Sequence, residues 1–203
     1  MNVPLICFEG PIGAGKTTLA TLLGTYTRYD VVLEKFNEND YLADFYADRL
    51  RWALPMQLWF LAERHRQFAE LGQRLATPIV ADYSPLKNEV FASLVLSGRD
   101  LRLFSNISVS LARTARVPTT LVYLDAPDNV LLDRIARRSR PYEEHIDANY
   151  LQAIRQSYKQ QLVLGSGIRV VRFDTSQLDL GSEAEMNAFF QSVLRAEQAE
   201  LDP

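Results

Sequence analysis

The chain opens with a short apolar run that leads directly into a glycine-rich loop. Residues 3–9 read VPLICFE, and residues 10–17 read GPIGAGKT, which matches the pattern Gly-x-x-x-x-Gly-Lys-Thr. In a strand–loop–helix context this pattern binds phosphate, because successive backbone N–H groups and the helix N-terminus all face the anion. The sequence therefore predicts a nucleotide-binding α/β fold with its phosphate site at the first turn.

The residues of this loop are predicted to hold ATP together with its metal ion. The amino group of Lys16 can reach the β- and γ-phosphates, and the hydroxyl of Thr17 can ligate Mg²⁺. ATP and Mg²⁺ are therefore the expected cofactors. The residues assigned to ATP binding are Gly10, Gly13, Ala14, Gly15, Lys16, Thr17 and Thr18.

Apolar runs alternate with helical patterns along the rest of the chain. Strands are predicted at residues 3–9, 31–34, 77–82, 119–127 and 168–173, and helices at 16–26, 40–49, 50–75, 85–97, 101–115, 128–140, 147–164 and 182–197. Continuously apolar strands between helices are typical of a parallel sheet that is buried on both faces. We expect a three-layer α/β/α fold of the P-loop kinase type, with a five-stranded parallel sheet, in which residues 1–203 form a single domain.

The composition argues against two large classes of partner. The chain has 22 Lys and Arg against 25 Asp and Glu, so no basic excess is available to neutralise a nucleic-acid backbone. Its apolar runs are shorter than a membrane span. The single cysteine, Cys7, excludes an internal disulfide. We expect a cytoplasmic enzyme or switch that binds small molecules, with neither nucleic acid nor membrane as a partner.

A basic segment distinguishes between classes of nucleotide-binding protein. The sequence lacks the Asn-Lys-x-Asp string of a GTPase, but DRIARRSRPYEE (residues 133–144) contains Arg134, Arg137, Arg138 and Arg140. Such guanidinium groups stabilise a transferred phosphoryl group, as in a phosphotransferase lid. The other interpretation is a solvated helix end that the helix dipole favours. If residues 134–146 form a lid, repulsion among the arginines should keep it open until triphosphate binds.

Two acidic residues follow predicted strands and should face the phosphate loop. Glu34 follows the second strand and Asp82 the third, and ligands in open α/β sheets lie beyond the carboxyl ends of the strands. One carboxylate can accept the proton of an attacking hydroxyl, and the other can hold Mg²⁺. We assign the base to Glu34 and the metal to Asp82 with Thr17. Asp125, after the fourth strand, is a rival for the metal, although a loop or cap role is preferred for it.

Two polar residues interrupt an otherwise apolar stripe of the long helix. Leu54, Gln57, Leu61, Arg64 and Phe68 fall on one helical face. Buried polar groups need partners, and a bound base would supply them, since Gln is a natural reader of a base edge. An edge of the core is the alternative. Pro55 indicates a kink or a helix start there. Aromatic residues that could wall a base pocket are Phe36, Tyr46, Trp52 and Phe91.

These residues resemble the deoxynucleoside kinases. The likeness spans most of the chain and rests on FEGPIGAGKTT, Glu34, DFYADRLRWALPMQLWFLAER and RIARRSRPYEE followed by IDANYL. It is closest to small bacterial members that phosphorylate deoxyadenosine or deoxyguanosine. The resemblance implies transfer of the ATP γ-phosphoryl group to the 5′-hydroxyl of a deoxynucleoside in nucleotide salvage, with deoxycytidine as a third candidate. It also implies a homodimer.

The resemblance carries roles onto matching positions. Glu34 corresponds to the general base, Tyr46 and Glu143 to groups that hold the sugar 3′-hydroxyl, Gln57 and Arg64 to base-reading positions, and Arg134, Arg138 and Arg140 to lid arginines. Two positions depart from the family pattern. Many members have an acid-Arg-Ser triplet after the third strand, whereas this chain has Tyr83 in place of the arginine. Lys87 stands where animal members have an aspartate that helps to read the base.

Two other functions remain open from the sequence. Thymidylate kinases share the loop and the lid, but they usually follow the second strand with an Arg-Glu-Pro stretch, which LEKFNEND (residues 33–40) lacks. The second alternative is a nucleotide-binding regulator without catalysis. Such a regulator has no use for a carboxylate base, so Glu34 favours an enzyme.

Overall fold

The computed structural model describes residues 3–74, 76–113, 115–140, 143, 146–164 and 168–199. The strands are β1 (Leu5–Glu9), β2 (Asp30–Val32), β3 (Ile79–Ala81), β4 (Thr120–Asp125) and β5 (Arg169–Asp174). The helices are α1 (Lys16–Thr27), α2 (Leu42–Ala47), α3 (Arg49–Gly72), α4 (Leu86–Val95), α5 (Gly98–Ala112), α6 (Asp128–Arg138), α7 (Ala148–Leu164) and α8 (Glu183–Gln198), with a 3-10 turn η1 (Phe36–Glu38). No helix within these ranges is long and apolar enough to cross a membrane.

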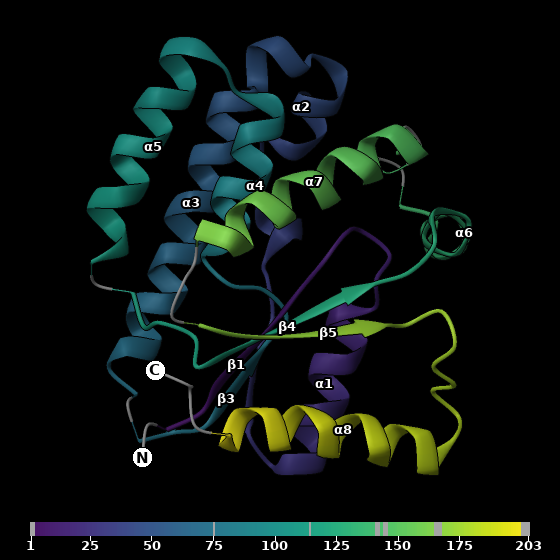
Figure 1. The fold of residues 1–203 in the computed structure, drawn as a ribbon. Helices are drawn as coiled ribbons and strands as arrows, with labels where there is room; N and C mark the ends of the chain where they lie inside the picture. Colours follow the sequence, from purple (N-terminus) through teal and green to yellow (C-terminus); the bar gives the residue numbers. More distant parts are fainter. Residues whose placement is uncertain are drawn as a thin grey trace.

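The five strands form one parallel sheet in the order β2-β3-β1-β4-β5. Helices α1 and α8 cover one face, and α3, α4 and α7 lie on the other (Figure 1). The predicted three-layer α/β/α architecture with a five-stranded parallel sheet is therefore confirmed.

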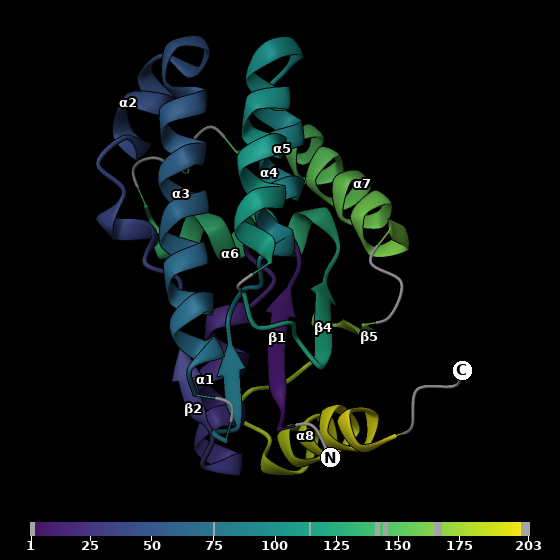
Figure 2. The same cartoon turned by 90° about the vertical axis from the view of Figure 1, so that its left-hand side faces the viewer.

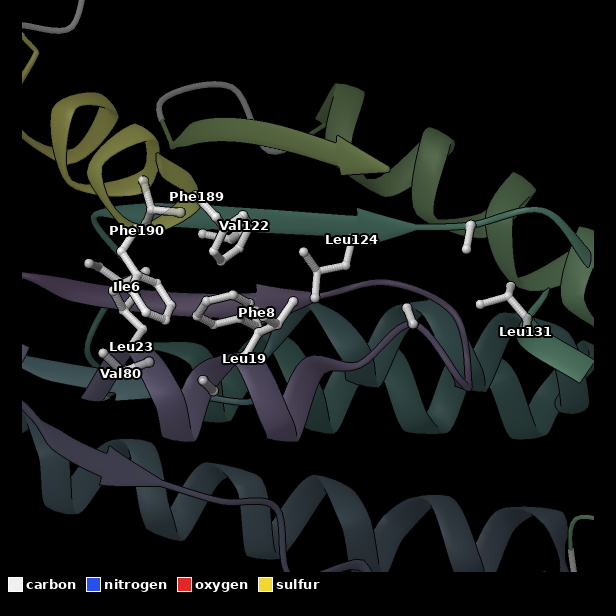
Figure 3. Close-up of a cluster of buried hydrophobic side chains, with 14 of the residues drawn as sticks. Ile6, Phe8, Leu19, Leu23, Val80, Val122, Leu124, Leu131, Phe189 and Phe190 are labelled. Atoms are coloured by element: carbon white, nitrogen blue, oxygen red, sulfur yellow. The ribbon is translucent and has the colours of Figure 1, made fainter. Parts of the chain in front are cut away.

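The central strand explains why both faces must be covered. Neighbouring side chains of a strand point to opposite faces, and all five residues of β1 are buried. Ile6 and Phe8 pack into the core beside α1 and α8 (Figure 3), whereas Leu5 and Cys7 pack with α3 residues on the opposite face. The buried apolar side chains of β1 thus hold the two helical layers to the sheet, with the phosphate loop at its carboxyl end.

The second strand differs from the prediction. We expected a buried strand at residues 31–34, but β2 spans Asp30–Val32 and occupies an edge of the sheet (Figure 2). An edge strand has a neighbour on one side only, so Val31 and Leu33 remain 37% and 41% exposed. The apolar run was correctly interpreted as a strand, but local hydropathy does not distinguish an edge from the centre.

Helix boundaries shift where a specific residue sets them. Asp48 caps α3 by accepting a hydrogen bond from the Arg51 N–H at 3.2 Å, so α3 starts at Arg49. Pro55 lies inside α3, and the prediction of a helix that starts there is wrong. Helix α6 starts at Asp128, as predicted, with Pro127 at the cap position.

Candidate active site

A cavity of about 480 Å³ lies beside the phosphate loop, between α2, α3, α4 and the end of α6. Of the residues predicted for the site, those that line it are Gly13, Ala14, Gly15, Lys16, Thr17, Thr18, Glu34, Tyr46, Gln57, Arg64, Asp82, Phe91, Arg134, Arg138, Arg140 and Glu143. Gly10 is not among the lining residues. One cavity therefore gathers side chains that lie more than 120 positions apart in the sequence.

The backbone of the phosphate loop requires glycine at its closest approaches. Gly10 has a φ of 138°, and a Cβ there would lie 2.0 Å from the carbonyl oxygen of Leu124. Gly13 has a φ of 86°, and its Cβ would lie 2.8 Å from the Leu131 oxygen. These contacts let the loop turn tightly against β4 and α6. Helix α1 starts at Lys16, so its N-terminus opens towards the cavity, as an anion site needs.

Lys16 folds back over the loop. Its ammonium donates hydrogen bonds to the carbonyl oxygens of Gly10 and Pro11, both at 2.8 Å. Burial and then the charge of Lys87 lower the pKa of Lys16 to about 7. A triphosphate in the cavity would favour the charged form, because an anion stabilises a nearby ammonium.

Oxygen ligands suited to a divalent cation meet beside the loop. The Thr17 hydroxyl donates to Asp82 Oδ2 at 2.6 Å, and Asp82 Oδ1 accepts the Glu34 backbone N–H at 2.8 Å. Hydroxyl and carboxylate oxygens are the donors that Mg²⁺ prefers, and the ion usually keeps waters or phosphate oxygens in addition. The described residues hold no cluster of three or more His, Cys, Asp or Glu that could bind a metal ion. Thr17 and Asp82 therefore fit a metal that arrives with nucleotide phosphates.

Asp125 lies outside this cavity. Its carboxylate accepts hydrogen bonds from Arg155 Nε at 2.8 and 3.0 Å and from the Ala126 N–H at 2.8 Å. These partners tie the end of β4 to α7, and they occupy the oxygens that a metal would need.

Glu34 is held by two cations from two helices. Its Oε1 accepts hydrogen bonds from Arg64 of α3 at 2.6 and 2.7 Å, and its Oε2 pairs with the ammonium of Lys87 of α4. Burial would raise the pKa of Glu34, but the charges of Lys87 and Arg64 outweigh it and lower the pKa to about 2. The carboxylate is therefore ionised and fixed in direction.

The two polar residues of the α3 stripe are both buried, each only 3% exposed. Arg64 binds Glu34 and also donates to Asn88 Oδ1 at 2.8 Å. Gln57 differs, because its Oε1 is the one buried side-chain polar atom in the described part of the chain that has no hydrogen-bond partner. An orphaned buried acceptor costs free energy, so a ligand donor in the cavity would relieve it.

The aromatic residues divide into two groups. Phe36, Tyr46 and Phe91 line the cavity as expected for a base pocket, together with Phe45 and Phe60, which the sequence had not indicated. The expectation for Trp52 is wrong. Its partly buried ring stacks on Tyr41 at 5.8 Å between centroids and is not among the lining residues.

The four arginines predicted for the lid each contact a partner in the free protein. Arg134 binds the Thr175 carbonyl oxygen at 2.8 Å, Arg137 points outward to Asp133, and Arg138 forms a bidentate pair with Glu143 at 2.6 and 2.7 Å. Arg140 lies over the Phe36 ring at 4.1 Å. Arg140 Nη1 also reaches Glu143 Oε1 at 3.5 Å, so Arg138 and Arg140 share one carboxylate that offsets part of their repulsion in the free protein.

The predicted lid is described only in part. It was expected at residues 134–146, of which residues 141, 142, 144 and 145 lie outside the described residues. Helix α6 carries the first part, beyond the carboxyl ends of β4 and β5 (Figure 1). Glu143 is buried and reaches the cavity.

Two residues with clear roles in the geometry were missed from the sequence. Lys87 was noted only as a departure at a base-reading position, yet it pairs with Glu34. Glu9 is fully buried at the end of β1, where Oε1 accepts hydrogen bonds from the Ser84 N–H and hydroxyl at 2.7 and 2.6 Å and Oε2 accepts one from the Tyr158 hydroxyl at 2.7 Å. Burial raises the pKa of Glu9. An acid at the end of an otherwise apolar strand was the available signal.

Comparisons with known proteins point in the same direction as this geometry. A family model described as deoxynucleoside kinase matches residues 6–195. The chain is 35% identical over 161 residues to a deoxyguanosine kinase of Bacillus subtilis, covering 78% of each chain. It is 30% identical over 178 residues to a deoxyadenosine kinase of Dictyostelium discoideum, covering 85% of this chain and 72% of the other. A solved structure of deoxyadenosine kinase from M. mycoides, with the products dCMP and dCDP bound, shares the fold with a TM-score of 0.81 at 19% identity, over 94% of this chain and 99% of that one.

Proposed function

Since the chain belongs to the deoxynucleoside kinase family, we propose that it transfers the γ-phosphoryl group of ATP to the 5′-hydroxyl of a purine deoxynucleoside. Deoxyadenosine and deoxyguanosine are the favoured acceptors, and deoxycytidine is a third candidate. The observation that carries the proposal is that the ionised Glu34 carboxylate shares one cavity with the phosphate loop. The product is a 5′-monophosphate for nucleotide salvage.

In the proposed reaction, Glu34 accepts a hydrogen bond from the 5′-hydroxyl and directs its oxygen at the γ-phosphorus. The new O–P bond forms as the bond to the leaving ADP oxygen breaks, and the hydroxyl proton passes to Glu34. A pKa of about 2 makes Glu34 a weak base. Phosphoryl transfer through a loose transition state depends mainly on positioning, so orientation of the hydroxyl is the larger contribution.

The remaining roles follow the lining of the cavity. Lys16 and the loop N–H groups hold the triphosphate, and bound Mg²⁺ on Thr17 and Asp82 would neutralise phosphate charge. Tyr46 and Glu143 hold the sugar 3′-hydroxyl, and Phe36 and Phe91 pack against the base. The groups proposed to stabilise the transferred phosphoryl are Arg134, Arg138 and Arg140.

Gln57 is proposed to read the base edge. Its orphaned Oε1 needs a donor, and the exocyclic amine of adenine or a ring N–H of guanine provides one. Arg64 has a partner on each of its three nitrogens, but its two terminal nitrogens each keep a second N–H. Arg64 can therefore orient Glu34 and still reach the base.

Gln57→Ala is expected to lower kcat/KM for the preferred deoxynucleoside, because a polar group of the base then lacks its partner. The loss of transition-state stabilisation should be about 1–3 kcal/mol. Stability should change little through hydrogen bonding, since Gln57 Oε1 makes no bond in the free protein. Steady-state kinetics with deoxyadenosine and deoxyguanosine measure the effect, with Gln73→Ala, an exposed glutamine directly after the same helix, as the control. A clear preference of the wild type for thymidine would refute the purine assignment and leave the kinase assignment intact.

Asp82→Asn is expected to raise the Mg²⁺ concentration for half-maximal activity by about tenfold or more, because it removes a charged oxygen ligand. Asp125→Asn should leave the Mg²⁺ requirement unchanged, since Asp125 is engaged by Arg155 away from the cavity. Activity titrated with Mg²⁺ at fixed ATP compares the two variants. The reverse result would place the metal at the end of β4.

The proposal also covers the organisation of the protein. We propose that residues 1–203 act as a single domain with a lid at residues 134–146, and that two copies form a homodimer in the cytoplasm, where ATP is abundant. Leu103 and Val109 of α5 are 47% and 66% exposed, and apolar side chains of this kind gain from being covered by a second copy. Light scattering measures the mass in solution.

The experiment that tests the proposed function is a substrate panel. ATP and Mg²⁺ are combined with each deoxynucleoside, each ribonucleoside and dTMP, and ADP and the phosphorylated product are measured. We expect turnover with purine deoxynucleosides. Turnover of dTMP alone would identify a thymidylate kinase, and ATP binding without any turnover would identify a regulator.

A further inference from the structure

A second lysine lies in the cavity beside Glu34. Lys87, near the start of α4, has a side chain that is 12% exposed, and its ammonium pairs with Glu34 Oε2. The other oxygen, Oε1, is taken by Arg64 of α3. Helices α3 and α4 stand side by side above the sheet (Figures 1 and 2). Each oxygen of the carboxylate therefore has its own cation, delivered by a different helix.

The turn before α4 fixes the position of the Lys87 backbone. The Lys87 N–H donates to the Ser84 carbonyl oxygen at 3.2 Å, and Ser84 is itself held by the buried Glu9. The next residue, Asn88, accepts a hydrogen bond from Arg64 at 2.8 Å. The first turn of α4 thus binds both members of the Arg64–Glu34 pair and closes a ring of charged and polar groups between the two helices.

Position 83 cannot supply this cation. The Tyr83 side chain is fully buried, its ring packs edge-on against Phe68 at 5.4 Å, and its hydroxyl donates to Gln67. It is not among the residues that line the cavity. Lys87 is therefore the residue after β3 that brings positive charge to Glu34.

We propose that Lys87 is a positioning residue for phosphoryl transfer, whose ammonium fixes Glu34 Oε2 where the attacking 5′-hydroxyl needs an acceptor. This inference rests on the proposed kinase function. A carboxylate oxygen has two lone pairs, so Oε2 can accept from Lys87 and from the hydroxyl together. The ammonium and the attacking hydroxyl then both donate to Glu34 Oε2, and the ammonium keeps this oxygen in position while the O–P bond forms.

The charges around Glu34 show why Lys87 matters more than a distant cation. Arg64 from α3 and Lys87 from α4 contact the Glu34 carboxylate, and Asp82 accepts the Glu34 backbone N–H. Lys16, Tyr83 and Tyr158 do not contact it but lie near enough to interact with it electrostatically. Among those that keep the carboxylate ionised, Lys87 contributes most and Arg64 next. Without Lys87, burial would oppose ionisation with Arg64 as the one cation still in contact with the carboxylate.

The test compares Lys87→Met with Lys87→Arg and with Lys159→Met, a matched loss of a lysine on α7 outside this cavity. The pKa of Glu34 is measured by carbon NMR in the free protein, and kcat/KM is measured from pH 4 to 8. We expect Lys87→Met to raise the pKa of Glu34 by about 1–3 pH units. We also expect it to lower kcat/KM about 10- to 100-fold, because misplacement of a reacting group costs up to about 10²-fold.

The pH profile separates positioning from a loss of stability. The wild type keeps Glu34 ionised throughout this range, so it shows no acid limb from this group. Lys87→Met should lose activity below about pH 5 as Glu34 takes up a proton. Lys87→Arg should restore most of the activity and the low pKa, and Lys159→Met should match the wild type.

Two results would overturn the inference. One is a Lys87→Met variant with wild-type kcat/KM, and the other is a variant whose activity falls while the pKa of Glu34 and the pH profile do not move. If the wild type phosphorylates no deoxynucleoside, the proposed function itself fails. The NMR titration still reports in that case whether Lys87 controls the ionisation of Glu34, so the two failures are distinguishable.

Discussion

Replacing Glu34 by glutamine is expected to lower kcat by about 10²–10⁴-fold while ATP binding stays near the wild-type level. The amide keeps the size of the side chain but cannot take the hydroxyl proton, and it loses its ion pairs with Arg64 and Lys87. Single-turnover kinetics give the rate of transfer, and equilibrium binding of ATP gives the affinity. Glu38→Gln is the matched control, because Glu38 pairs with Lys35 and is not among the residues that line the cavity.

The pH dependence gives a second check on Glu34. A carboxyl group with a depressed pKa of about 2 is ionised at every pH above about 3. The kcat/KM of the wild type should therefore show no acid limb from Glu34 between pH 5 and 7. Near wild-type activity of Glu34→Gln would move the role of base to Asp82.

Arg138→Ala is expected to lower kcat by about 10³-fold or more while changing ATP affinity far less. An arginine that meets the charge of a transferred phosphoryl group acts mainly in the transition state. In the free protein Arg138 forms a bidentate ion pair with the buried Glu143. Exchange of that carboxylate for a phosphoryl oxygen would release Glu143 towards the sugar, so that one movement serves both substrates.

The neighbouring arginine provides the control. Arg137 lies on the same turn of α6, is 77% exposed and pairs with Asp133, so Arg137→Ala should leave kcat unchanged. Cleavage by trypsin after Arg137 and Arg138 should slow when nucleotide and Mg²⁺ bind, because closure excludes the protease along with water. If ligand gave no protection and Arg138→Ala changed only ATP affinity, these arginines would be static phosphate binders.

The fold was predictable because its determinants are local in sequence. The apolar runs, the glycines of the phosphate loop and the periodic helices each specify an element, and alternation of strands and helices specifies a covered parallel sheet. The edge position of β2 was not predictable in the same way. An edge strand has one neighbouring strand and a central strand has two. The hydropathy of residues 31–34 does not say how many neighbours that segment will have.

Site residues were predictable where a polar or acidic residue stands at a strand end or on an apolar helix face, because few chemical roles suit such a residue there. Glu34, Asp82 and Gln57 were identified for that reason, and all three line the cavity. The partners of charged side chains were not predictable, because they come from other elements. Lys87 meets Glu34 across 53 positions of sequence, and Arg137 turns away from the cavity although its neighbour Arg138 enters it.

The buried Glu9 carboxylate has a consequence for the order in which the chain completes its structure. Its partners Ser84 and Tyr158 lie 75 and 149 positions further along. During synthesis from the N-terminus, β1 and the phosphate loop emerge long before either partner exists, and a buried carboxylate without hydrogen bonds is costly. The end of β1 therefore reaches its final surroundings only after α7 has been made. The phosphate loop is therefore translated well before its surroundings at the end of β1 are complete.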